Sequence, residues 1–412
     1  MGDVFELTLD AMAHGGEALG RHEGRAIFVG YAIPGERVRV EIVEDHERYA
    51  RARLVEVLEP SPSRVAPPCP HFGAAACGGC QWQHIDYAVQ ARIKGLVTLD
   101  QFKRVGKFAE PPILEPLPDA VGWEYRNHAL FRTDAEGRMG FLSARSHAVH
   151  PIDDCLILHP LLSNLLQSLD MVYPEMEWME MRAGTATGDL LLAFQSRHEE
   201  PPALEVDFPL SVVQIRHDDA IAPLIGLDYI TEIVREREFR ISATSFYQVN
   251  SAQAGVLVDL VLEALDLRGY EKVLDAYCGV GLFTAFLAPE ASFVTGIEAD
   301  PTAIADADFN MADADNVDLY EGLVEDVLPE LDETLDAAVL DPPRSGLERE
   351  ALDALAAHRP RKIVYVSCDP ATLARDARRL VRQGYTLEWV QPVDLFPQTY
   401  HVENVALLTR EM

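Results

Sequence analysis

Cys368 ends an apolar, β-branched run and stands where a nucleophile could act. The run at residues 362–368 is typical of a buried parallel strand, and ligands of open α/β sheets bind beyond the carboxyl ends of such strands. Asp369 and Pro370 follow directly, and Pro370 predicts the start of a helix whose N-terminal dipole would favour the thiolate. Taken alone, Cys368 also fits the usual role of a free cysteine, a small buried side chain.

A second predicted strand leads into a turn suited to a nucleoside. Residues 272–281 contain the strand and a Gly-x-Gly turn, and nineteen residues after Gly279 a third strand ends at Glu298. This spacing resembles a Rossmann-type site, in which an acidic residue accepts the ribose hydroxyls. Thr284 stands where a dinucleotide fingerprint has its third glycine, so the open turn suits S-adenosylmethionine better than NAD. A glycine turn that serves packing alone is the alternative.

The fourth predicted strand, residues 335–340, ends in Asp341-Pro342-Pro343-Arg344. The prolines force the preceding aspartate into an extended conformation at the mouth of the strand. Asp-Pro-Pro at this position is familiar from S-adenosylmethionine-dependent enzymes that modify bases, and where an aromatic residue follows, the usual target is an exocyclic amine. Here arginine follows and a cysteine comes one strand later, which indicates methylation of carbon.

Together with Glu403 near the C-terminus, these residues make the chain resemble the RNA uridine-5-methyltransferase family. The matching motifs span nearly the whole C-terminal half: Ser245-Phe-Tyr-Gln-Val-Asn250, Asp275-Ala-Tyr-Cys-Gly-Val-Gly281, Asp341-Pro-Pro-Arg344, Ser367-Cys-Asp-Pro370 and His401-Val-Glu403. The resemblance implies an RNA (uracil-5-)-methyltransferase, which uses S-adenosylmethionine to methylate carbon 5 of a specific uridine in RNA.

The resemblance also implies a role for each matching residue. Cys368 would add to carbon 6 of uracil and so make carbon 5 nucleophilic, and Glu403 would remove the proton from carbon 5. The target base must leave its stack to reach a buried thiolate. The implied cofactor-binding residues are Gln248, Tyr277, Gly279, Gly281, Glu298 and Asp341.

Four cysteines in the N-terminal half form a second candidate site: Cys69, Cys77, Cys80 and, far downstream, Cys155. Such clustering favours metal binding or catalysis over disulfides. Four thiolates suit zinc or an iron–sulfur cluster, although structural zinc more often pairs two Cys-x-x-Cys knuckles. Three clustered cysteines with a distant fourth match the family members that hold a 4Fe–4S cluster, so the resemblance implies that cofactor. A radical S-adenosylmethionine enzyme is disfavoured, because the triad is not Cys-x3-Cys-x2-Cys.

The organisation of the chain predicts an α/β protein of three domains. Residues 1–62 contain short strands separated by glycine turns, which predicts a small β-barrel, and the resemblance implies an RNA-binding TRAM domain there. Residues 63–235 begin with a proline-rich linker and continue as a central mixed α/β domain with the iron–sulfur site and a helix at residues 156–171. Residues 236–412 form the Rossmann-like methyltransferase domain.

The net charge of −32 argues against a nucleic-acid partner, because RNA-binding proteins are usually basic. An acidic surface that maintains solubility is the simple explanation. Two local basic patches could still bind the RNA backbone: Arg359, Arg361, Lys362, Arg375, Arg378, Arg379 and Arg382 around the Cys368 strand, and Arg92, Lys94, Lys103, Arg104 and Lys107 after the cysteine triad. The apolar runs are too short for a membrane span and no signal peptide is present. We therefore expect a cytoplasmic monomer whose partner is RNA and that has no membrane partner.

The expected RNA is 23S ribosomal RNA, because the transfer-RNA branch of the family tends to lack the four cysteines. A tRNA uridine-5-methyltransferase is the alternative. An RNA-binding iron–sulfur protein without catalysis would be expected to have lost at least one of Cys368, Glu403 and Asp341, and all are present. A DNA cytosine-5 methyltransferase would normally carry a Pro-Cys pair after its fourth strand.

Overall fold

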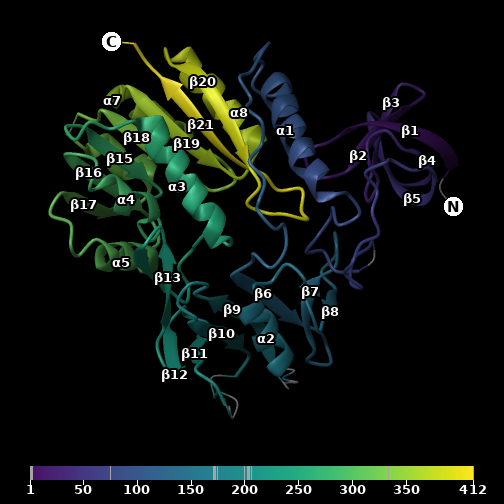
Figure 1. Ribbon diagram of the computed structural model, residues 1–412, viewed down its shortest axis with the longest axis horizontal. Helices are drawn as coiled ribbons and strands as arrows, with labels where there is room; N and C mark the ends of the chain where they lie inside the picture. Colours follow the sequence, from purple (N-terminus) through teal and green to yellow (C-terminus); the bar gives the residue numbers. More distant parts are fainter. Residues whose placement is uncertain are drawn as a thin grey trace.

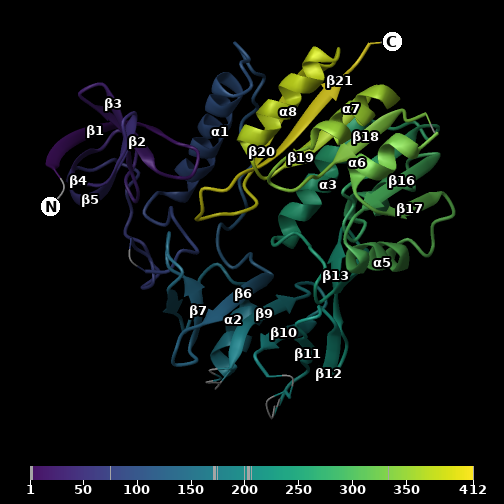
Figure 2. The same ribbon diagram turned by 180° about the vertical axis from the view of Figure 1, so that it is seen from behind.

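The computed structural model describes residues 3–74, 76–169, 173, 175–198, 200–201, 205, 207–332 and 334–411. Three units are visible in Figures 1 and 2: an N-terminal barrel in purple, a central sheet in teal, and a C-terminal α/β layer in green and yellow. This arrangement confirms the predicted fold class, with a small β-barrel, a central mixed region and a Rossmann-like domain.

The N-terminal unit is a closed barrel with the strand order β1-β2-β3-β5-β4. Its strands are β1 (Val4–Met12), β2 (Ala18–His22), β3 (Arg25–Val29), β4 (Arg37–Asp45) and β5 (Tyr49–Glu59). Gly20 lies inside β2 and not in one of the predicted glycine turns. A Cβ at Gly20 would lie 2.5 Å from the Thr8 carbonyl oxygen, so the close approach of β1 and β2 requires glycine.

The central unit is a sheet with the order β12-β11-β10-β9-β6-β7-β8, and helix α2 packs on β9. The elements are β6 (His128–Thr133), β7 (Met139–Leu142), β8 (Val149–Pro151), α2 (Pro160–Ser168), β9 (Met176–Ala183), β10 (Leu190–Ser196), β11 (Ser211–Ile215) and β12 (Ile221–Ile225). The predicted helix at residues 156–171 begins later, since the chain makes a turn before His159 caps α2. Its expected end at residue 171 lies outside the described residues. A hairpin of β13 (Tyr229–Val234) and β14 (Arg237–Ser242) leads to the C-terminal unit.

The C-terminal unit is a sheet with the order β17-β16-β15-β18-β19-β21-β20, in which β21 runs antiparallel to both of its neighbours. The strands are β15 (Lys272–Ala276), β16 (Phe293–Glu298), β17 (Val317–Glu321), β18 (Ala337–Leu340), β19 (Lys362–Ser367), β20 (Thr386–Val393) and β21 (Glu403–Thr409). The helices are α3 (Ser251–Leu265), α4 (Leu282–Leu287), α5 (Pro301–Asn310), α6 (Val324–Val327), α7 (Arg349–His358) and α8 (Pro370–Arg382), with a short 3-10 helix at Leu328–Glu330. The central strands are buried on both faces, which explains their continuous apolar runs.

Helix α1 (Tyr87–Arg104) joins the N-terminal part of the chain to the C-terminal sheet. It packs against α8, and the chain after it forms bridges from Ile113 and Leu117 to β20. In Figure 1 α1, in blue, lies beside the yellow helix α8. Among the helices that the structure describes, none is long and apolar enough to cross a membrane.

Candidate active site

A cavity of about 1030 Å³ lies between the cysteine-bearing loop, the start of the central sheet and the C-terminal unit. It is bordered by the carboxyl ends of β15, β16, β18 and β19, which is where open α/β sheets bind ligands. The loop with the first three cysteines and the start of β6 form the opposite wall. Eleven of the twelve residues predicted for catalysis, cofactor binding or metal binding line this cavity, and the twelfth, Gly281, lies between the lining residues Val280 and Leu282.

The glycine turn after β15 faces the end of β16, as predicted. The amide of Gly279 donates a hydrogen bond to Oε2 of Glu298 at 2.9 Å, and Oε1 of Glu298 accepts from the amides of Ala299 and Asp300 at 2.7 and 2.8 Å. Nothing lies within 4 Å of the place where a Cβ of Gly279 would be, so the turn is open on the cavity side. A carboxylate has about four acceptor positions, so Glu298 retains capacity for a hydroxyl group.

Gln248 and Asp341 come from distant segments and meet in the cavity. Nε2 of Gln248 donates a hydrogen bond to Oδ2 of Asp341 at 3.2 Å. Burial, followed by the nearby charges of Asp275 and Glu298, raises the pKa of Asp341 to about 7. The segment that leads to Gln248 is anchored by the buried Asp306, which accepts hydrogen bonds from the hydroxyls of Ser242 and Ser245 at 2.7 and 2.6 Å.

Cys368 and Glu403 are brought together by the reversed strand β21. In the antiparallel register of β19 and β21, Ser367 pairs with Asn404. Extending this register by one residue puts Cys368 opposite Glu403. The Glu403 side chain is only 3% exposed, and its Oε1 has no hydrogen-bond partner among the described residues. Burial and the Asp341 charge raise the pKa of Glu403 well above the ordinary value.

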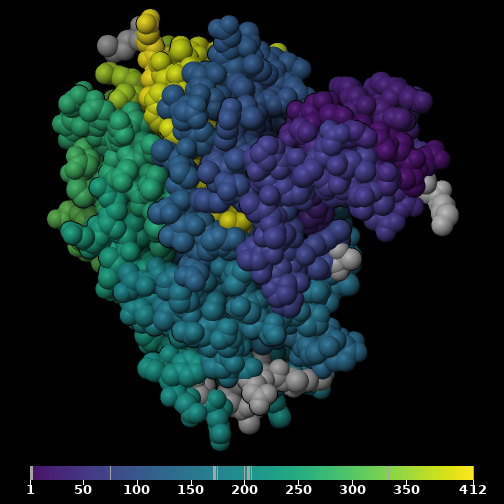
Figure 3. Space-filling model, turned by 45° about the vertical axis from the view of Figure 1, so that its right-hand side comes forward, coloured from purple at the N-terminus to yellow at the C-terminus, as the bar shows by residue number. Residues whose placement is uncertain are grey.

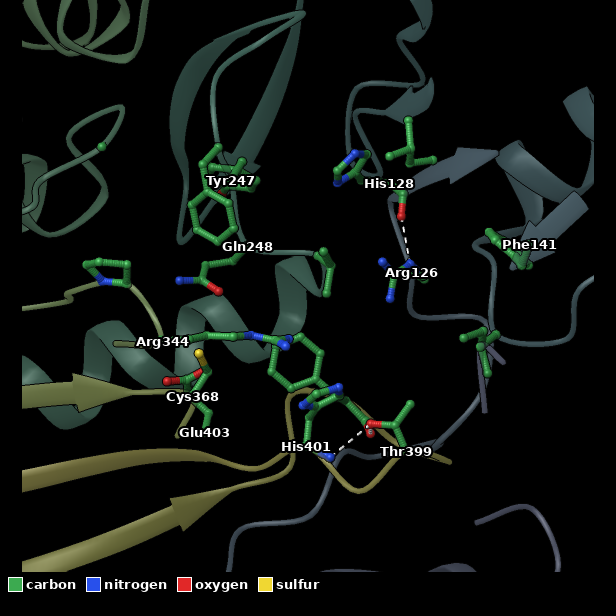
Figure 4. A pocket seen from close by; sticks show the side chains of 18 of the residues that line it. Arg126, His128, Phe141, Tyr247, Gln248, Arg344, Cys368, Thr399, His401 and Glu403 are labelled. Atoms are coloured by element: carbon green, nitrogen blue, oxygen red, sulfur yellow. Dashed lines mark hydrogen bonds between the residues drawn. The ribbon is translucent and has the colours of Figure 1, made fainter. Parts of the chain in front are cut away.

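Arg344 is the cation that lowers the pKa values of both Cys368 and Glu403. Figure 4 shows its side chain gathered with those of Cys368 and Glu403 on one side of the cavity. Burial raises the pKa of the Cys368 thiol to about 12 and the Glu403 charge adds to the rise, whereas Arg344 lowers it through its charge and a hydrogen bond. The sequence drew attention to Arg344 only as the residue after two prolines, and its effect on the thiol depends on the fold.

The predicted effect of the α8 N-terminus on Cys368 is wrong. Asp369 caps α8 itself, because its Oδ1 accepts from the amides of Ala371 and Thr372 at 2.9 and 3.0 Å. The helix was expected to favour the thiolate, but burial raises the pKa of Cys368 instead. Aspartate is a preferred N-cap residue, so the Cys-Asp-Pro sequence itself carried this signal.

The loop between β20 and β21, residues 394–402, is supported by α1. Nζ of Lys94 contacts Oδ1 of Asp394 at 2.5 Å and the Phe396 carbonyl oxygen at 3.0 Å, and both side chains of the ion pair are about 1% exposed. The amide groups of Gln90 and Gln398 are hydrogen-bonded at 2.9 Å. Figure 3 shows part of this C-terminal chain, in yellow, enclosed by the blue segment around α1. Lys94, expected in an exposed basic patch, is therefore buried, and no sequence pattern indicated this.

The four N-terminal cysteines share one wall of the cavity as free thiols. Burial raises the pKa of Cys80 to about 12 and of Cys155 to about 11, and the other thiols of the set add to each rise. The donor set is therefore one that fits a four-thiolate site. Within the described residues, however, no group of three or more His, Cys, Asp or Glu side chains is arranged closely enough to hold a metal ion.

Comparisons with known proteins agree with the fold and the cavity. Residues 221–411 match the family profile described as tRNA (Uracil-5-)-methyltransferase, and residues 1–55 match the TRAM domain. A Streptomyces avermitilis protein called an uncharacterized RNA methyltransferase is 36% identical, covering 99% of this chain and 98% of its own. One from Halalkalibacterium halodurans, with the same description, is 35% identical, covering 98% and 97%.

A solved structure also matches nearly the whole chain. It is Pyrococcus abyssi tRNA (uracil-54, C5)-methyltransferase in complex with S-adenosyl-L-homocysteine, with 25% identity, a TM-score of 0.77, and coverage of 98% of this chain and 100% of that one. Fold and cavity thus define an S-adenosylmethionine-dependent methyltransferase. The chain belongs to the tRNA (uracil-5-)-methyltransferase family and is an RNA (uracil-5-)-methyltransferase with an N-terminal TRAM domain. The predicted family, reaction class and cofactor S-adenosylmethionine are confirmed.

Proposed function

We propose that this enzyme methylates carbon 5 of a specific uridine in 23S ribosomal RNA through a covalent adduct with Cys368. The observation that carries the proposal is the buried pair of Cys368 and Glu403 at the cavity, opposite each other in the β19–β21 register. Cys368 first loses its thiol proton to solvent, its sulfur then forms a bond to carbon 6, and the ring electrons shift towards carbon 5 and the carbonyl at carbon 4. After methylation, Glu403 takes the proton from carbon 5, the carbon 6–sulfur bond breaks, and the thiolate returns.

The charges around Cys368 suit this sequence of steps. Burial raises the pKa of the Cys368 thiol to about 12, so the thiol must lose its proton as the reaction begins. Arg344 lowers that pKa and therefore stabilises the thiolate when the base has displaced water. The raised pKa of Glu403 makes its carboxylate a stronger base once it is ionised.

We propose that Gln248, Tyr277, Gly279, Gly281, Glu298 and Asp341 bind the cofactor. S-adenosylmethionine would supply an electrophilic methyl group when bound. Glu298 is suited to the ribose hydroxyls, because its carboxylate faces the open glycine turn. The hydrogen bond from Gln248 to Asp341 orients both side chains at the mouth of β18. Burial holds Asp341 near the midpoint of its titration at neutral pH, so it can accept or donate a hydrogen bond there.

We further propose that Cys69, Cys77, Cys80 and Cys155 hold a 4Fe–4S cluster. The support is the set of four free thiols, from two distant segments, that line one wall of the cavity. Protein purified without air should be brown and contain about four iron and four sulfide per chain. Cys80→Ser should lose this iron, whereas Cys278→Ser, which changes a buried cysteine outside the set, should keep it. A colourless anaerobic preparation with one zinc ion would contradict the cluster.

Transfer RNA is the second candidate target, because the Pyrococcus abyssi enzyme that matches over the whole chain acts on uracil-54 of tRNA. Mapping of 5-methyluridine in RNA from cells with and without the gene separates the two targets. Loss of one 5-methyluridine from 23S ribosomal RNA supports the first proposal. Loss from tRNA alone would replace it with the second.

Domain boundaries at residues 62/63 and 235/236, a monomeric state and a cytoplasmic location are part of the same proposal. The first boundary follows the last barrel strand, which ends at Glu59, and the second falls in the turn of the β13–β14 hairpin. Size-exclusion chromatography with light scattering tests the monomer.

A further inference from the structure

The loop between barrel strands β1 and β2 reaches the turn that carries Cys368. Nε2 of His14 lies 3.2 Å from Oδ2 of Asp369, the residue that directly follows the cysteine. A small hollow of about 130 Å³ lies at this contact and is lined by His14, Gly15, Cys368, Arg344, Tyr400 and His401. The N-terminal barrel therefore forms part of the immediate surroundings of the candidate nucleophile.

Asp369 is held at both of its carboxylate oxygens. Oδ1 accepts the two cap hydrogen bonds of α8, and Oδ2 contacts His14. Burial alone would raise the pKa of Asp369, but the hydrogen bond from His14 and those from the Thr372 and Ala371 amides hold it at about 2. The backbone of the turn is also tied locally, because the Asp369 amide donates to the Ser367 hydroxyl at 3.2 Å. The orientation of the turn thus depends on a contact from another domain.

The barrel loop is itself firmly positioned. Its Gly16 packs so closely on the loop between β20 and β21 that an added Cβ would lie 2.6 Å from Cβ of Tyr400. The Gly16 carbonyl accepts a hydrogen bond from Nε1 of Trp82 at 3.1 Å. Glu17 is anchored by Nε of Arg51 at 3.1 Å and by Nη2 of Arg145 at 2.6 Å. These contacts hold the loop, and with it His14, in place beside Asp369.

We infer that His14 is a positioning residue for the Cys368 turn, so that the TRAM barrel completes the active site in addition to any contact with RNA. His14 does not touch the reacting atoms. It acts by fixing the Asp369 carboxylate, and with it the direction of the neighbouring cysteine. This inference rests on the proposed role of Cys368 as nucleophile, and the experiment below keeps the two apart.

The test uses RNA with 5-fluorouridine at the target, which traps the adduct because fluorine cannot leave as a cation. The rate of adduct formation is measured at saturating RNA for His14→Ala, His14→Gln and His14→Asn in the full-length protein. Glutamine has an amide nitrogen at about the reach of Nε2, whereas the nitrogen of asparagine falls short at the level of Nδ1. We expect His14→Ala and His14→Asn to be slowed on the order of tenfold, and His14→Gln to recover most of the rate. Binding of S-adenosyl-L-homocysteine should be unchanged in all three.

Two glycines provide a matched second test that leaves His14 in place. Gly15 and Gly16 both have positive φ, at +99° and +82°, so alanine strains either backbone. At Gly15 the new Cβ meets nothing within 4 Å, whereas at Gly16 it collides with Tyr400. Gly16→Ala should therefore slow adduct formation more than Gly15→Ala. Tyr31→Phe, which removes another barrel contact, from Tyr31 to the Gly73 carbonyl, should leave the rate unchanged.

Each outcome has a distinct meaning. Wild-type adduct rates in His14→Ala at saturating RNA, with weaker RNA binding only, would overturn the inference and make His14 an RNA contact. Equal losses in His14→Gln and His14→Ala would also overturn it. An adduct that persists in Cys368→Ala would instead overturn the proposed function, whatever the His14 variants do.

Discussion

Replacing Glu403 by glutamine should stop the proposed reaction after methyl transfer without damage to the fold. Glutamine has nearly the same shape, but it cannot take a proton from carbon 5. Because the site is buried, with the side chain 3% exposed, water has little access to act in its place. Removal of a positioned general base costs about 10²–10⁴-fold in rate. This corresponds to about 2.7–5.4 kcal/mol of activation free energy at about 1.36 kcal/mol per factor of ten.

The same burial predicts that Glu403→Gln is at least as stable as the wild type at pH 8. The folded-state pKa of Glu403 lies well above its ordinary value. A carboxyl group of this kind lowers the free energy of unfolding as the pH rises from its unfolded pKa, about 4.3, towards the folded one. Glutamine does not ionise, so the variant does not lose free energy of unfolding in this way. Oε1 of Glu403 has no hydrogen-bond partner among the described residues, so the substitution breaks no hydrogen bond at that atom.

The assay is a denaturing gel of the protein with end-labelled target RNA and S-adenosylmethionine. Glu403→Gln should accumulate a protein–RNA band whose RNA carries the new methyl group, and wild type should show little of it on unmodified RNA. Cys368→Ala is the matched control and should form no band, while its binding of RNA and cofactor is retained. Full turnover by Glu403→Gln would refute the reasoning and move the base role to a bound water molecule. A band in Cys368→Ala would leave Cys278 as the next candidate nucleophile.

Three further results are expected. Cys368 and Glu403 act in their deprotonated forms and both pKa values are raised, so the rates of adduct formation and turnover should rise with pH through the neutral range. Arg344→Gln should move this rise to higher pH, because Arg344 lowers both pKa values. A flat profile between pH 6 and 9 would contradict the assignment. Lys94→Met should reduce the free energy of unfolding by about 3–5 kcal/mol, because it leaves the Asp394 charge buried without its partner. In denaturant titrations, the double variant Lys94→Met with Asp394→Leu should recover much of this lost free energy. Equal losses in the single and double variants would contradict a buried ion pair. The net charge of −32 makes the folded protein repel itself. Salt screens this repulsion, because the Debye length falls from about 10 Å at 0.1 M to about 3 Å at 1 M, so the thermal unfolding midpoint should rise between 0.1 and 1 M KCl. An unchanged midpoint would mean that self-repulsion is unimportant.

The sequence predicted the residues of the site better than their surroundings. Cys368 and Glu403 stand beside recognisable local motifs, and their meeting follows from one property of the fold, the reversal of β21. The protonation state of Cys368 could not be predicted from the helix that follows it, because burial and the Glu403 charge raise its pKa. Local patterns identify side chains that are able to react, but the pKa of each depends on groups from other strands.

The supports of the site were less predictable because they come from far along the chain. Lys94 is a charged residue in a helix, and such residues are normally exposed. It is buried because Asp394, three hundred residues later, offers a carboxylate at the same place. The contact from His14 to Asp369 is of the same kind. Neither end of such a pair has an unusual pattern in its own segment, so only the tertiary fold reveals the partner.

The pairing of charges explains how so acidic a protein can attract RNA to one place. In the barrel, Arg37 and Arg39 are each paired with glutamates on neighbouring strands, so the TRAM domain offers little unpaired positive charge there. Arg126 and Arg344 line the cavity, and neither has a carboxylate partner within 4.0 Å among the described residues. A phosphate could pair with Arg126 without breaking an ion pair, whereas Arg344 already acts on the Cys368 thiol. Because few phosphates need be neutralised, affinity should fall only slowly with salt, and the salt that screens the acidic surface need not prevent RNA from reaching Cys368.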